Sequence, residues 1–324
     1  MFARTALLAV LLCASSAPRT ADAPWNASGH RILSALTWNE LKPGTREAIT
    51  ALLKQHPRYR ADLLAGLEGD PGAESTARYA FGAAANWPDT VRSPSNPLSH
   101  DHNHPAWHYI NLPFVLEGQA VDEKPAKEGE GPRDVVEALH KCVADLRNQD
   151  LPAAERAIAL CWVLHLTEDI HQPLHACTLF SKQFPQGDRG GNSFLVTRSP
   201  FDRKSVTNLH ALWDSMLGSY ASCAIDDCVA TGIAAQQHLA RRFHAEQIAI
   251  RDPARWAEES HEVAVTFVYR DGTLRGVRDG EAGTDQPPLL PEDYLRVAEG
   301  VALQRGVLAA YRLADLLEDC FAGH

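Results

Sequence analysis

The sequence predicts an all-α protein, formed by a single mainly helical domain with long loops and one short hairpin. Three observations predict this fold class. Apolar residues recur at helical spacing over most of the chain, no internal repeat divides it, and no change of composition marks a second domain. The chain has 324 residues, of which 45% are hydrophobic, and this suffices for one large core.

The helical pattern covers eight segments, in which apolar side chains return every three or four residues. Ser28 is a candidate N-cap of the first helix, and Pro43 and Pro152 lie at the starts of two others, where proline is tolerated. Pro173 has no backbone N–H and is expected to end or bend the helix before it. The expected helices are 27–41, 43–55, 133–148, 152–171, 207–219, 231–249, 254–266 and 292–320.

Four polar stretches rich in glycine, proline or charge are expected to be loops, because they offer little to bury. They are residues 93–106, 116–133, 181–206 and 268–291. The third contains G-D-R-G-G-N followed by S-F-L-V-T, which predicts the short hairpin.

The first residues have the pattern of a secretory leader. Arg4 supplies the positive start, and an apolar run from Ala6 to Ala14 is too short to span a bilayer. Ala21-Asp22-Ala23 has the small-x-small form of a cleavage site, and a cut after Ala23 or after Pro24 fits it. The predicted organisation is therefore a leader at 1–24 and one domain at 25–324, exported to the periplasm or secreted.

The net charge of −10 argues against long-range capture of nucleic acid by a basic surface. It does not exclude an enzyme that cleaves phosphate esters, because bound metal ions would reverse the charge inside one cleft. An even number of cysteines remains after the leader, which permits disulfides in an exported chain. Cys223 and Cys228 are the candidate pair, whereas Cys161 suits burial on a helix.

Histidine and aspartate recur at helical spacing in two motifs. H-L-T-E-D-I-H-Q-P-L-H spans residues 165–175, and N-L-H-A-L-W-D spans residues 208–214. Residues four apart share a helix face, so His165 with Asp169, and His210 with Asp214, can each close on one metal ion. Imidazole nitrogen and carboxylate oxygen are zinc ligands. Asp169 has two oxygens and can bridge two ions.

Three further candidates lie outside these pairs. His175 follows Pro173, where the backbone turns, and can therefore serve a different ion from His165. Asp89 in W-P-D-T-V-R and His108 in W-H-Y-I-N are expected outside the helices. Taken singly, Asp89 also suits a turn, His108 suits the core, and one i,i+4 His/Asp pair suits a surface hydrogen bond. The two pairs together favour metal binding.

Other histidines fit simpler roles. His100, His102 and His104 alternate in a polar loop and are expected to be solvated. His171 lies between predicted ligands and is expected to support one of them. His56 and His244 are expected on the surface.

These motifs resemble those of the zinc-dependent single-strand nuclease and 3′-nucleotidase family, which shares its fold with bacterial zinc phospholipase C. The resemblance runs from W-N-A-S-G-H at residue 25 to the last helix, and His210-x3-Asp214 differs from the His-x3-Glu typical of the phospholipase branch. It implies three zinc ions. The implied ligands are Asp89, His108, His165 and Asp169 for the first ion; the backbone amine and carbonyl of Trp25, with His30 and Asp169, for the second; and His175, His210 and Asp214 for the third.

The resemblance also implies roles around the ions. Arg92 would hold the phosphate beside Asp89 and Asp169, while Tyr109 and Asn192 would contact a nucleobase. Asn111 stands where nucleases of this family often carry Asp, so base preference is expected to differ. Arg92 also suits an ordinary surface position, and Tyr109 also suits the core.

The expected function is hydrolysis of single-stranded DNA and RNA to 5′-phosphate products, with 3′-nucleotidase activity. The predicted form is a monomer that does not insert into membranes. Two alternatives stay open. One is a zinc phospholipase C acting on lipid head groups, which an apolar rim around the cleft would favour. The other is a non-catalytic exported zinc-binding protein, in which Arg92 would have no role.

Overall fold

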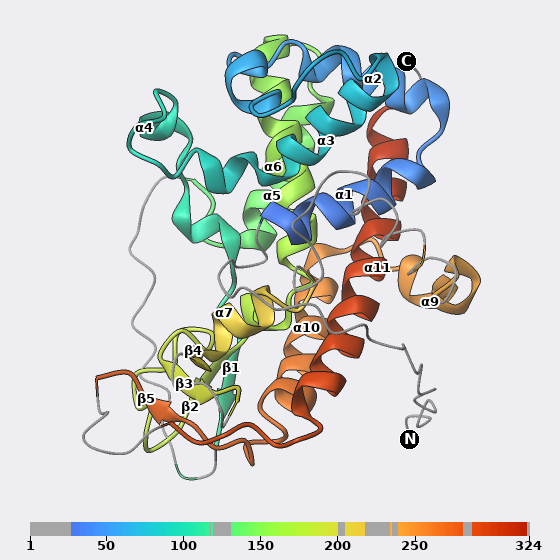
Figure 1. The fold of residues 1–324 in the computed structure, drawn as a ribbon. Helices are drawn as coiled ribbons and strands as arrows, with labels where there is room; N and C mark the ends of the chain where they lie inside the picture. Colours follow the sequence, from blue (N-terminus) through green and yellow to red (C-terminus); the bar gives the residue numbers. More distant parts are fainter. Residues whose placement is uncertain are drawn as a thin grey trace.

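The computed structural model describes residues 27–116, 118, 131–199, 205–217, 234, 239–280 and 287–322. Helices make up most of these residues, and small sheets lie at one end of the molecule (Figure 1). The predicted all-α class is therefore confirmed. None of the helices in the described part of the chain has both the length and the hydrophobicity that crossing a bilayer requires.

The helices, in chain order, are α1 (Ala27–Glu40), α2 (Pro43–Leu53), α3 (Ala73–Thr90), α4 (Ser99–His102), α5 (Val135–Arg147), α6 (Ala153–Asp169), α7 (Leu209–Asp214), α9 (Ala245–Ile248), α10 (Pro253–Val263) and α11 (Tyr294–Cys320). Shorter 3-10 turns are Pro105–His108, Pro173–Ala176 and Arg241–His244, and π-helical turns are Tyr59–Leu63 and Ala264–Val268. The strands are β1 (Pro113–Val115), β2 (Thr178–Phe180), β3 (Phe194–Thr197), β4 (Val206–Asn208) and β5 (Val277–Arg278).

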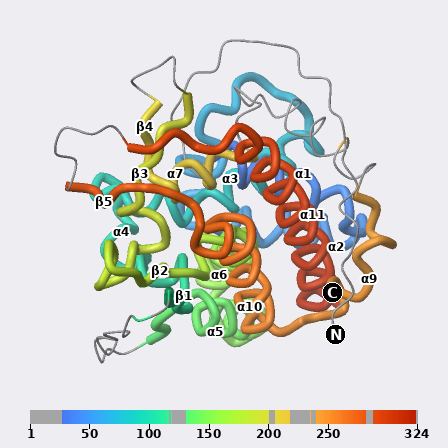
Figure 2. The backbone as a smooth tube through the Cα atoms, turned by 90° about the horizontal axis from the view of Figure 1, so that it is seen from below, coloured from blue at the N-terminus to red at the C-terminus, as the bar shows by residue number. Residues whose placement is uncertain are grey.

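Helix α6 lies at the centre of the core. Every residue from Ala157 to Asp169 is buried, as expected for a helix that is apolar on nearly all sides. It packs against α5, α3 and α11 (Figure 2). Gln172 is extended because a proline follows it, and Pro173 starts a 3-10 turn in a new direction. The end of α6 and this turn therefore present His165, Asp169 and His175 from inside the protein.

Helix α11 holds α1 in place over α6. It has 27 residues, so it is about 40 Å long at 1.5 Å per residue. The backbone of α11 approaches α1 closely at Gly306, where a Cβ atom would lie 2.8 Å from Leu33 Cδ2. A larger residue at this point would require the side chain of Leu33 on α1 to move.

The small sheets join the segments that follow two predicted ligands. β1 pairs with β2 in parallel, and the N–H of Ile110 donates to the carbonyl of His175 (2.8 Å). This pairing brings His108 and His175 together. In the other sheet β3 lies between β4 and β5, antiparallel to both. The predicted hairpin corresponds to β3 and β4.

Several sequence-based element predictions need correction. Helix α3 was not predicted, because Pro88 near its end suggested a turn, whereas the helix includes Pro88 and continues to Thr90. Ser28 lies within α1, which begins at Ala27. Of the expected helix 207–219, the structure describes residues 207–217, where α7 follows the end of β4, and residues 218–219 lie outside the described part. Within 231–249 the structure describes a 3-10 turn and α9, and residues 231–233 and 235–238 lie outside the described part.

Candidate metal centre

Side chains able to bind a metal ion converge where α1, α3, α6 and α7 meet. They form three groups of donors, and within each group the donor atoms lie within 4.8 Å of one another. The groups are His30, His165 and Asp169; Asp89, His108 and His165; and His175, His210 and Asp214. The structure thus brings together all the predicted ligands that it describes. Trp25 lies outside the described residues.

Asp169 connects the groups. Its Oδ2 lies 3.0 Å from His165 Nε2 and 3.1 Å from His108 Nδ1. Its Oδ1 faces the other way, 3.7 Å from His30 Nε2 and 3.5 Å from His175 Nδ1. One oxygen on each side is the geometry of a carboxylate that bridges two metal ions.

The spacing of the donor atoms provides a test of whether zinc fits. In a tetrahedral site with ligands about 2.0–2.1 Å from the ion, donor atoms are roughly 3.3 Å apart. His210 Nε2 and Asp214 Oδ2 are 3.4 Å apart, and His175 Nε2 and Asp214 Oδ1 are 3.5 Å apart. His108 Nδ1 and His165 Nε2 are 2.9 Å apart. The spacing and the nitrogen and oxygen donors fit zinc.

The first group depends on a local feature of α3. Asp89 lies in the last turn of this helix, so the expectation that it lies outside the helices was wrong. In the turn before Asp89, the carbonyl of Ala85 accepts from His165 Nδ1 (2.8 Å). Asp89 Oδ1 lies 4.0 Å from His108 Nδ1. The last turns of α3 therefore present both a carboxylate and a ring acceptor to the histidines of the centre.

The third group is built by two short segments. His175 lies on the 3-10 turn after Pro173, and its ring stacks on that of His210 with centroids 5.0 Å apart. His210 and Asp214 share a face of α7. The Asn208 side chain caps this helix by accepting from the N–H of Ala211 (2.7 Å). As predicted from the turn at Pro173, His175 belongs to a different group from His165.

Four of the rings are held by a hydrogen bond at Nδ1, which leaves Nε2 for a metal ion. The contacts are His165 to Ala85 O (2.8 Å), His175 to His108 O (2.9 Å), His210 to Gly190 O (2.7 Å) and His30 to Glu168 Oε2 (2.5 Å). Such contacts fix both the tautomer and the orientation of a metal-binding ring. His108 differs, because its Nδ1 faces Asp169 and its buried Nε2 has no hydrogen-bond partner among the described residues.

The loop that supplies the Gly190 carbonyl has little freedom. Gly190 has φ of 62°, and a Cβ atom there would lie 2.7 Å from the carbonyl oxygen of Leu174. A side chain would therefore displace the loop from His210. Asp188 anchors the same loop: its carboxylate accepts from the N–H of Leu179 (3.0 Å) and from the hydroxyl of Tyr269 (2.6 Å).

Two buried residues that contact predicted ligands were not indicated by spacing. Glu168 lies against His30, and Gln172 donates from Nε2 to Asp214 Oδ1 (2.6 Å). The Gln172 Oε1 accepts from the N–H of Leu174, which fixes the side chain at both ends. The sequence signal that could have indicated these two residues is the presence of an acidic and an amide side chain at or just after the end of a helix that is apolar on nearly all sides.

Burial and mutual charge shift the pKa values in the centre. Burial and the nearby His165 lower the pKa of His30 to about 3. Burial opposes ionisation of Asp169, but His165 and His175 hold the pKa of its carboxyl well below the usual value. Burial also opposes protonation of His175, yet Asp169 and Asp214 raise its pKa to about 9. At neutral pH Asp89, Asp169 and Asp214 are charged and His30 is neutral, as metal binding requires, whereas His175 must lose a proton. Burial acts in the other direction on Glu168 and raises the pKa of its carboxyl well above the usual value.

The predicted substrate-contacting residues have contacts of their own, and Arg92 has one with the metal centre. Arg92 Nη1 donates to Asp89 Oδ1 (3.2 Å), so Arg92 contacts a predicted ligand. Tyr109 follows His108 and is 42% exposed, which excludes the core position. Asn111 accepts from the hydroxyl of Thr178 (2.7 Å), and Asn192 Nδ2 donates to the carbonyl of Arg189 (2.9 Å).

Other histidines and cysteines differ in part from expectation. His171 is bonded to Thr167 O and Arg312 rather than placed behind a ligand. His56 and His244 are buried, not on the surface. The cysteines in the described residues are free and buried: Cys142, Cys161, Cys177 and Cys320. Burial of Cys161 is as predicted, and Cys223 and Cys228 lie outside the described part.

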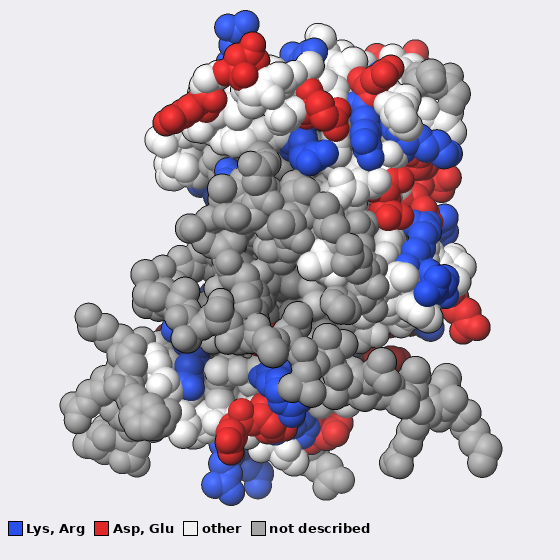
Figure 3. Space-filling model, turned by 45° about the vertical axis from the view of Figure 1, so that its right-hand side comes forward, with Lys and Arg blue, Asp and Glu red and all other residues white. Residues whose placement is uncertain are grey.

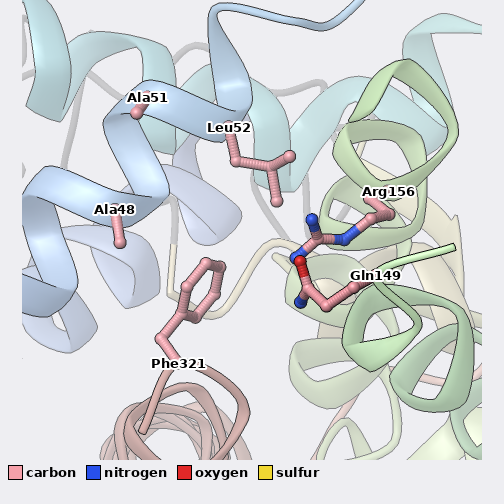
Figure 4. A pocket seen from close by; sticks show the side chains of 6 residues that line it. All are labelled: Ala48, Ala51, Leu52, Gln149, Arg156 and Phe321. Atoms are coloured by element: carbon pink, nitrogen blue, oxygen red, sulfur yellow. The ribbon is translucent and has the colours of Figure 1, made fainter. Parts of the chain in front are cut away.

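A separate hollow of about 300 Å³ is lined by α2, the segment from Gln149 into α6, and the residue after α11 (Figure 4). Its lining residues are Ala48, Ala51, Leu52, Gln149, Arg156 and Phe321. None of them can bind zinc through an imidazole, carboxylate or thiolate. The hollow therefore does not belong to the metal centre.

The helical fold and the buried His/Asp centre define the class of protein, a helical protein with a candidate multinuclear metal site. Residues 25–322 match the S1/P1 nuclease family, and the chain belongs to it. Endonuclease 2 of Arabidopsis thaliana is 25% identical over 296 residues, which are 85% of this chain and 86% of the relative. Endonuclease 1 of Arabidopsis thaliana is 23% identical over 323 residues, 97% of this chain and 91% of the relative.

Family membership agrees with the resemblance inferred from the motifs. The chain is a nuclease, a hydrolase that acts on phosphodiester bonds, and its substrates are nucleic acids.

Proposed function

We propose that the chain is an exported, zinc-dependent phosphodiesterase that cleaves single-stranded DNA and RNA to 5′-phosphate products and also acts as a 3′-nucleotidase. The observation that carries this proposal is the convergence of three donor groups on Asp169, with spacings near those of tetrahedral zinc. Four rings already have Nδ1 engaged and Nε2 directed to the centre. Such preorganisation suits a catalytic metal cluster better than a loose binding surface.

Bound zinc would lower the pKa of water from 15.7 to about 7 and offset charge on the phosphate, so no side-chain nucleophile is required. The proposed ligands are those of the three donor groups, with Trp25 added to the His30 group through its backbone amine and carbonyl. The chain's own part is to hold these ligands and to place the phosphate. Arg92 is held at the edge by Asp89, where its guanidinium can donate to equatorial phosphate oxygens.

Selectivity for single strands rests on the depth of the centre and on Tyr109. The donor groups are largely buried between helices, so a stacked duplex cannot bring its backbone to them. A splayed nucleotide can, and its base can stack on the exposed Tyr109 ring. Tyr109 directly follows His108 in the chain, which supports a stacking surface near the metal centre.

Two asparagines supply complementary groups for a base. Asn111 uses its Oδ1 to accept from Thr178, so its NH2 group is the one offered to a ligand. Asn192 uses its Nδ2 to donate to Arg189, so its Oδ1 is the one offered. One donor and one acceptor at different positions permit recognition of a base edge.

Attraction of the substrate would come from the metal centre rather than from a basic surface. On the face shown in Figure 3, Lys and Arg side chains lie among Asp and Glu side chains over the described residues. The whole chain is acidic, with a net charge of −10. Zinc ions would make the centre locally positive, and local charge decides what enters a cleft.

A substrate panel tests the proposal. Zinc-loaded and chelator-treated protein are incubated with single-stranded DNA, duplex DNA, RNA, 3′-AMP and phosphatidylcholine vesicles. We expect the zinc-loaded protein to release 5′-phosphate oligonucleotides and adenosine, to act slowly on duplex DNA, and to leave the vesicles intact. Release of phosphocholine would indicate the phospholipase alternative. Full zinc loading without hydrolysis of any substrate would indicate a zinc-binding protein.

N-terminal sequencing of the purified mature protein tests the export proposal. We expect the mature chain to begin at Trp25, because the second ion needs a free amine at this residue. A mature chain that retains Met1 would contradict export. A stable start at Pro24 would contradict the role of the Trp25 amine.

A further inference from the structure

One of the four Nδ1 contacts differs from the other three. His165, His175 and His210 are each held by a main-chain carbonyl, but His30 is held by the side chain of Glu168. Glu168 is fully buried, and a buried acid needs a specific partner. No ligand role was predicted for this residue.

Both carboxylate oxygens of Glu168 point to α1. Oε2 lies 2.5 Å from His30 Nδ1, and Oε1 accepts from the hydroxyl of Ser34 (3.1 Å). Ser34 is one helical turn beyond His30, so the two contacts fix α1 along its axis and about it. Glu168 also directly precedes Asp169, whose Oδ1 faces the opposite side of the His30 ring at 3.7 Å from Nε2.

We propose that Glu168 is the positioning residue of the second metal ion: its carboxylate holds His30 with Nε2 directed at Asp169. This inference rests on the proposed zinc-dependent function. Zinc bound at Nε2 would leave the ring proton on Nδ1, and Glu168 is placed to accept the hydrogen bond that this N–H donates. Without this acceptor the Nδ1 side of the His30 ring would lose its hydrogen bond, and the ring would keep its stacking on His165 (centroids 4.2 Å apart) and its approach to Asp169 at Nε2.

The competing explanation is that Glu168 only fastens α1 to α6. The two explanations differ in what a substitution changes. Loss of a positioning contact lowers the affinity of one ion, and such outer contacts are typically worth 10- to 100-fold in metal affinity. Loss of a fastening contact lowers the stability of the metal-free protein and leaves the affinities of the ions equal to those of the wild type.

The experiment compares Glu168→Ala and Glu168→Gln with Ser34→Ala as the matched control, because Ser34 contacts Glu168 but not the ring. Zinc binding to the full mature chain is titrated against a chelator, and the metal-free forms are compared by thermal unfolding. We expect Glu168→Ala to weaken one equivalent of zinc 10- to 100-fold and to leave the equivalent at His175, His210 and Asp214 unchanged. Glu168→Gln retains an oxygen acceptor, so it should recover part of the loss, and Ser34→Ala should bind all equivalents normally.

The readouts also separate this inference from the proposed function. Wild-type affinity of every zinc equivalent in Glu168→Ala and Glu168→Gln would overturn the positioning role, even if both unfold at lower temperature. Equal weakening in Ser34→Ala would overturn it as well, since fastening alone would then explain the effect. If the wild type binds zinc but cleaves no nucleic acid, the proposed function fails while the affinity comparison still decides the role of Glu168. If Glu168→Ala does not fold, Glu168→Gln carries the comparison.

Discussion

Two largely buried polar clusters share the segment from His165 to His175, and they differ in the cations that stand beside their carboxylates. The metal centre contains carboxylates and imidazoles, with Arg92 as a cation at its edge. The second cluster, named here the arginine cluster, joins this segment to α10 and α11. Its members are His171, Glu259, Arg305 and Arg312.

The arginine cluster is complete in itself. Arg312 donates to His171 Nε2 (2.9 Å), to Glu259 Oε2 (2.7 Å) and to Gln247 O (2.7 Å). Arg305 donates to the Ser260 hydroxyl (2.7 Å) and also to Glu259. In such a cluster each charge has a partner inside the protein, so loss of one member destabilises the fold by leaving another unpaired. Apart from Arg92 at its edge, the donor groups of the metal centre contain, among the described residues, no Lys or Arg side chain that would balance their carboxylates. This difference distinguishes a metal-binding site from a structural contact between helices.

The largest expected effect is at Asp169, which links the donor groups of the metal centre. Asp169→Asn preserves the shape but removes the charge and one of the bridging oxygens. We expect nuclease activity to fall by about 10³-fold, since losing one group that stabilises transition-state charge already costs 10²–10³. Elemental analysis should show fewer zinc ions per chain. Unchanged zinc content and activity would show that the clusters do not differ in the proposed way.

Arg312→Met is the corresponding change in the arginine cluster. It removes two contacts to Glu259, which keeps Arg305 as a partner, so the cost should be at most about 3–5 kcal/mol, the cost of breaking a fully buried ion pair. The free energy of unfolding, measured with guanidinium, should fall by no more than this amount. Zinc content and activity of the folded protein at low temperature should remain those of the wild type. The triple variant Arg305→Met, Arg312→Met and Glu259→Met is the control: it leaves none of the three charges of the cluster without its partner and should recover much of the stability. Loss of zinc from folded Arg312→Met would contradict a purely structural cluster.

When the metal ions are removed, protonation of His175 should supply part of the positive charge that the ions would provide beside Asp169 and Asp214. Asp169 and Asp214 raise the pKa of His175 from 6.5 to about 9 in the folded protein against the effect of burial. A histidine whose pKa rises on folding stabilises the protein fully below pH 6.5, and this contribution is lost as the pH rises to about 9. The chelated protein should therefore lose about 2 kcal/mol of unfolding free energy between pH 6.5 and 8.5, at 1.36 kcal/mol per pKa unit. His175→Gln should show a smaller change, and an equal change in both would refute the assignment to His175.

The smallest expected effect is at the edge of the metal centre. Tyr109→Ala removes the proposed stacking surface, and stacking is worth about 1–3 kcal/mol per base. We expect KM for dinucleotides to rise about 10-fold with little change in kcat and no change in zinc content. Val115→Ala is the matched control, because Val115 is another exposed apolar residue, on β1. If both variants have the wild-type KM, Tyr109 is not part of the base site.

The comparison also shows which features the sequence could predict. Helices α5, α6 and α11 were predicted because their apolar spacing is regular, and the His-x3-Asp pairs indicated ligands because helix geometry makes residues four apart neighbours. Helix α3 was missed because Pro88 suggested a turn. Glu168 and Arg312 were missed for another reason: their partners, His30 and Glu259, are distant in the sequence, and no local period encodes a contact between segments that only the fold brings together.

The carbonyls that hold His165, His175 and His210 belong to the main chain of Ala85, His108 and Gly190. No codon change can delete a carbonyl oxygen, so these three contacts persist through any mutation that leaves the backbone path intact. Variation can reach them only indirectly, through insertions, deletions or residues such as Gly190 that determine the path. The acceptor for His30 is, by contrast, the side chain of Glu168, so a substitution at this one codon can remove it.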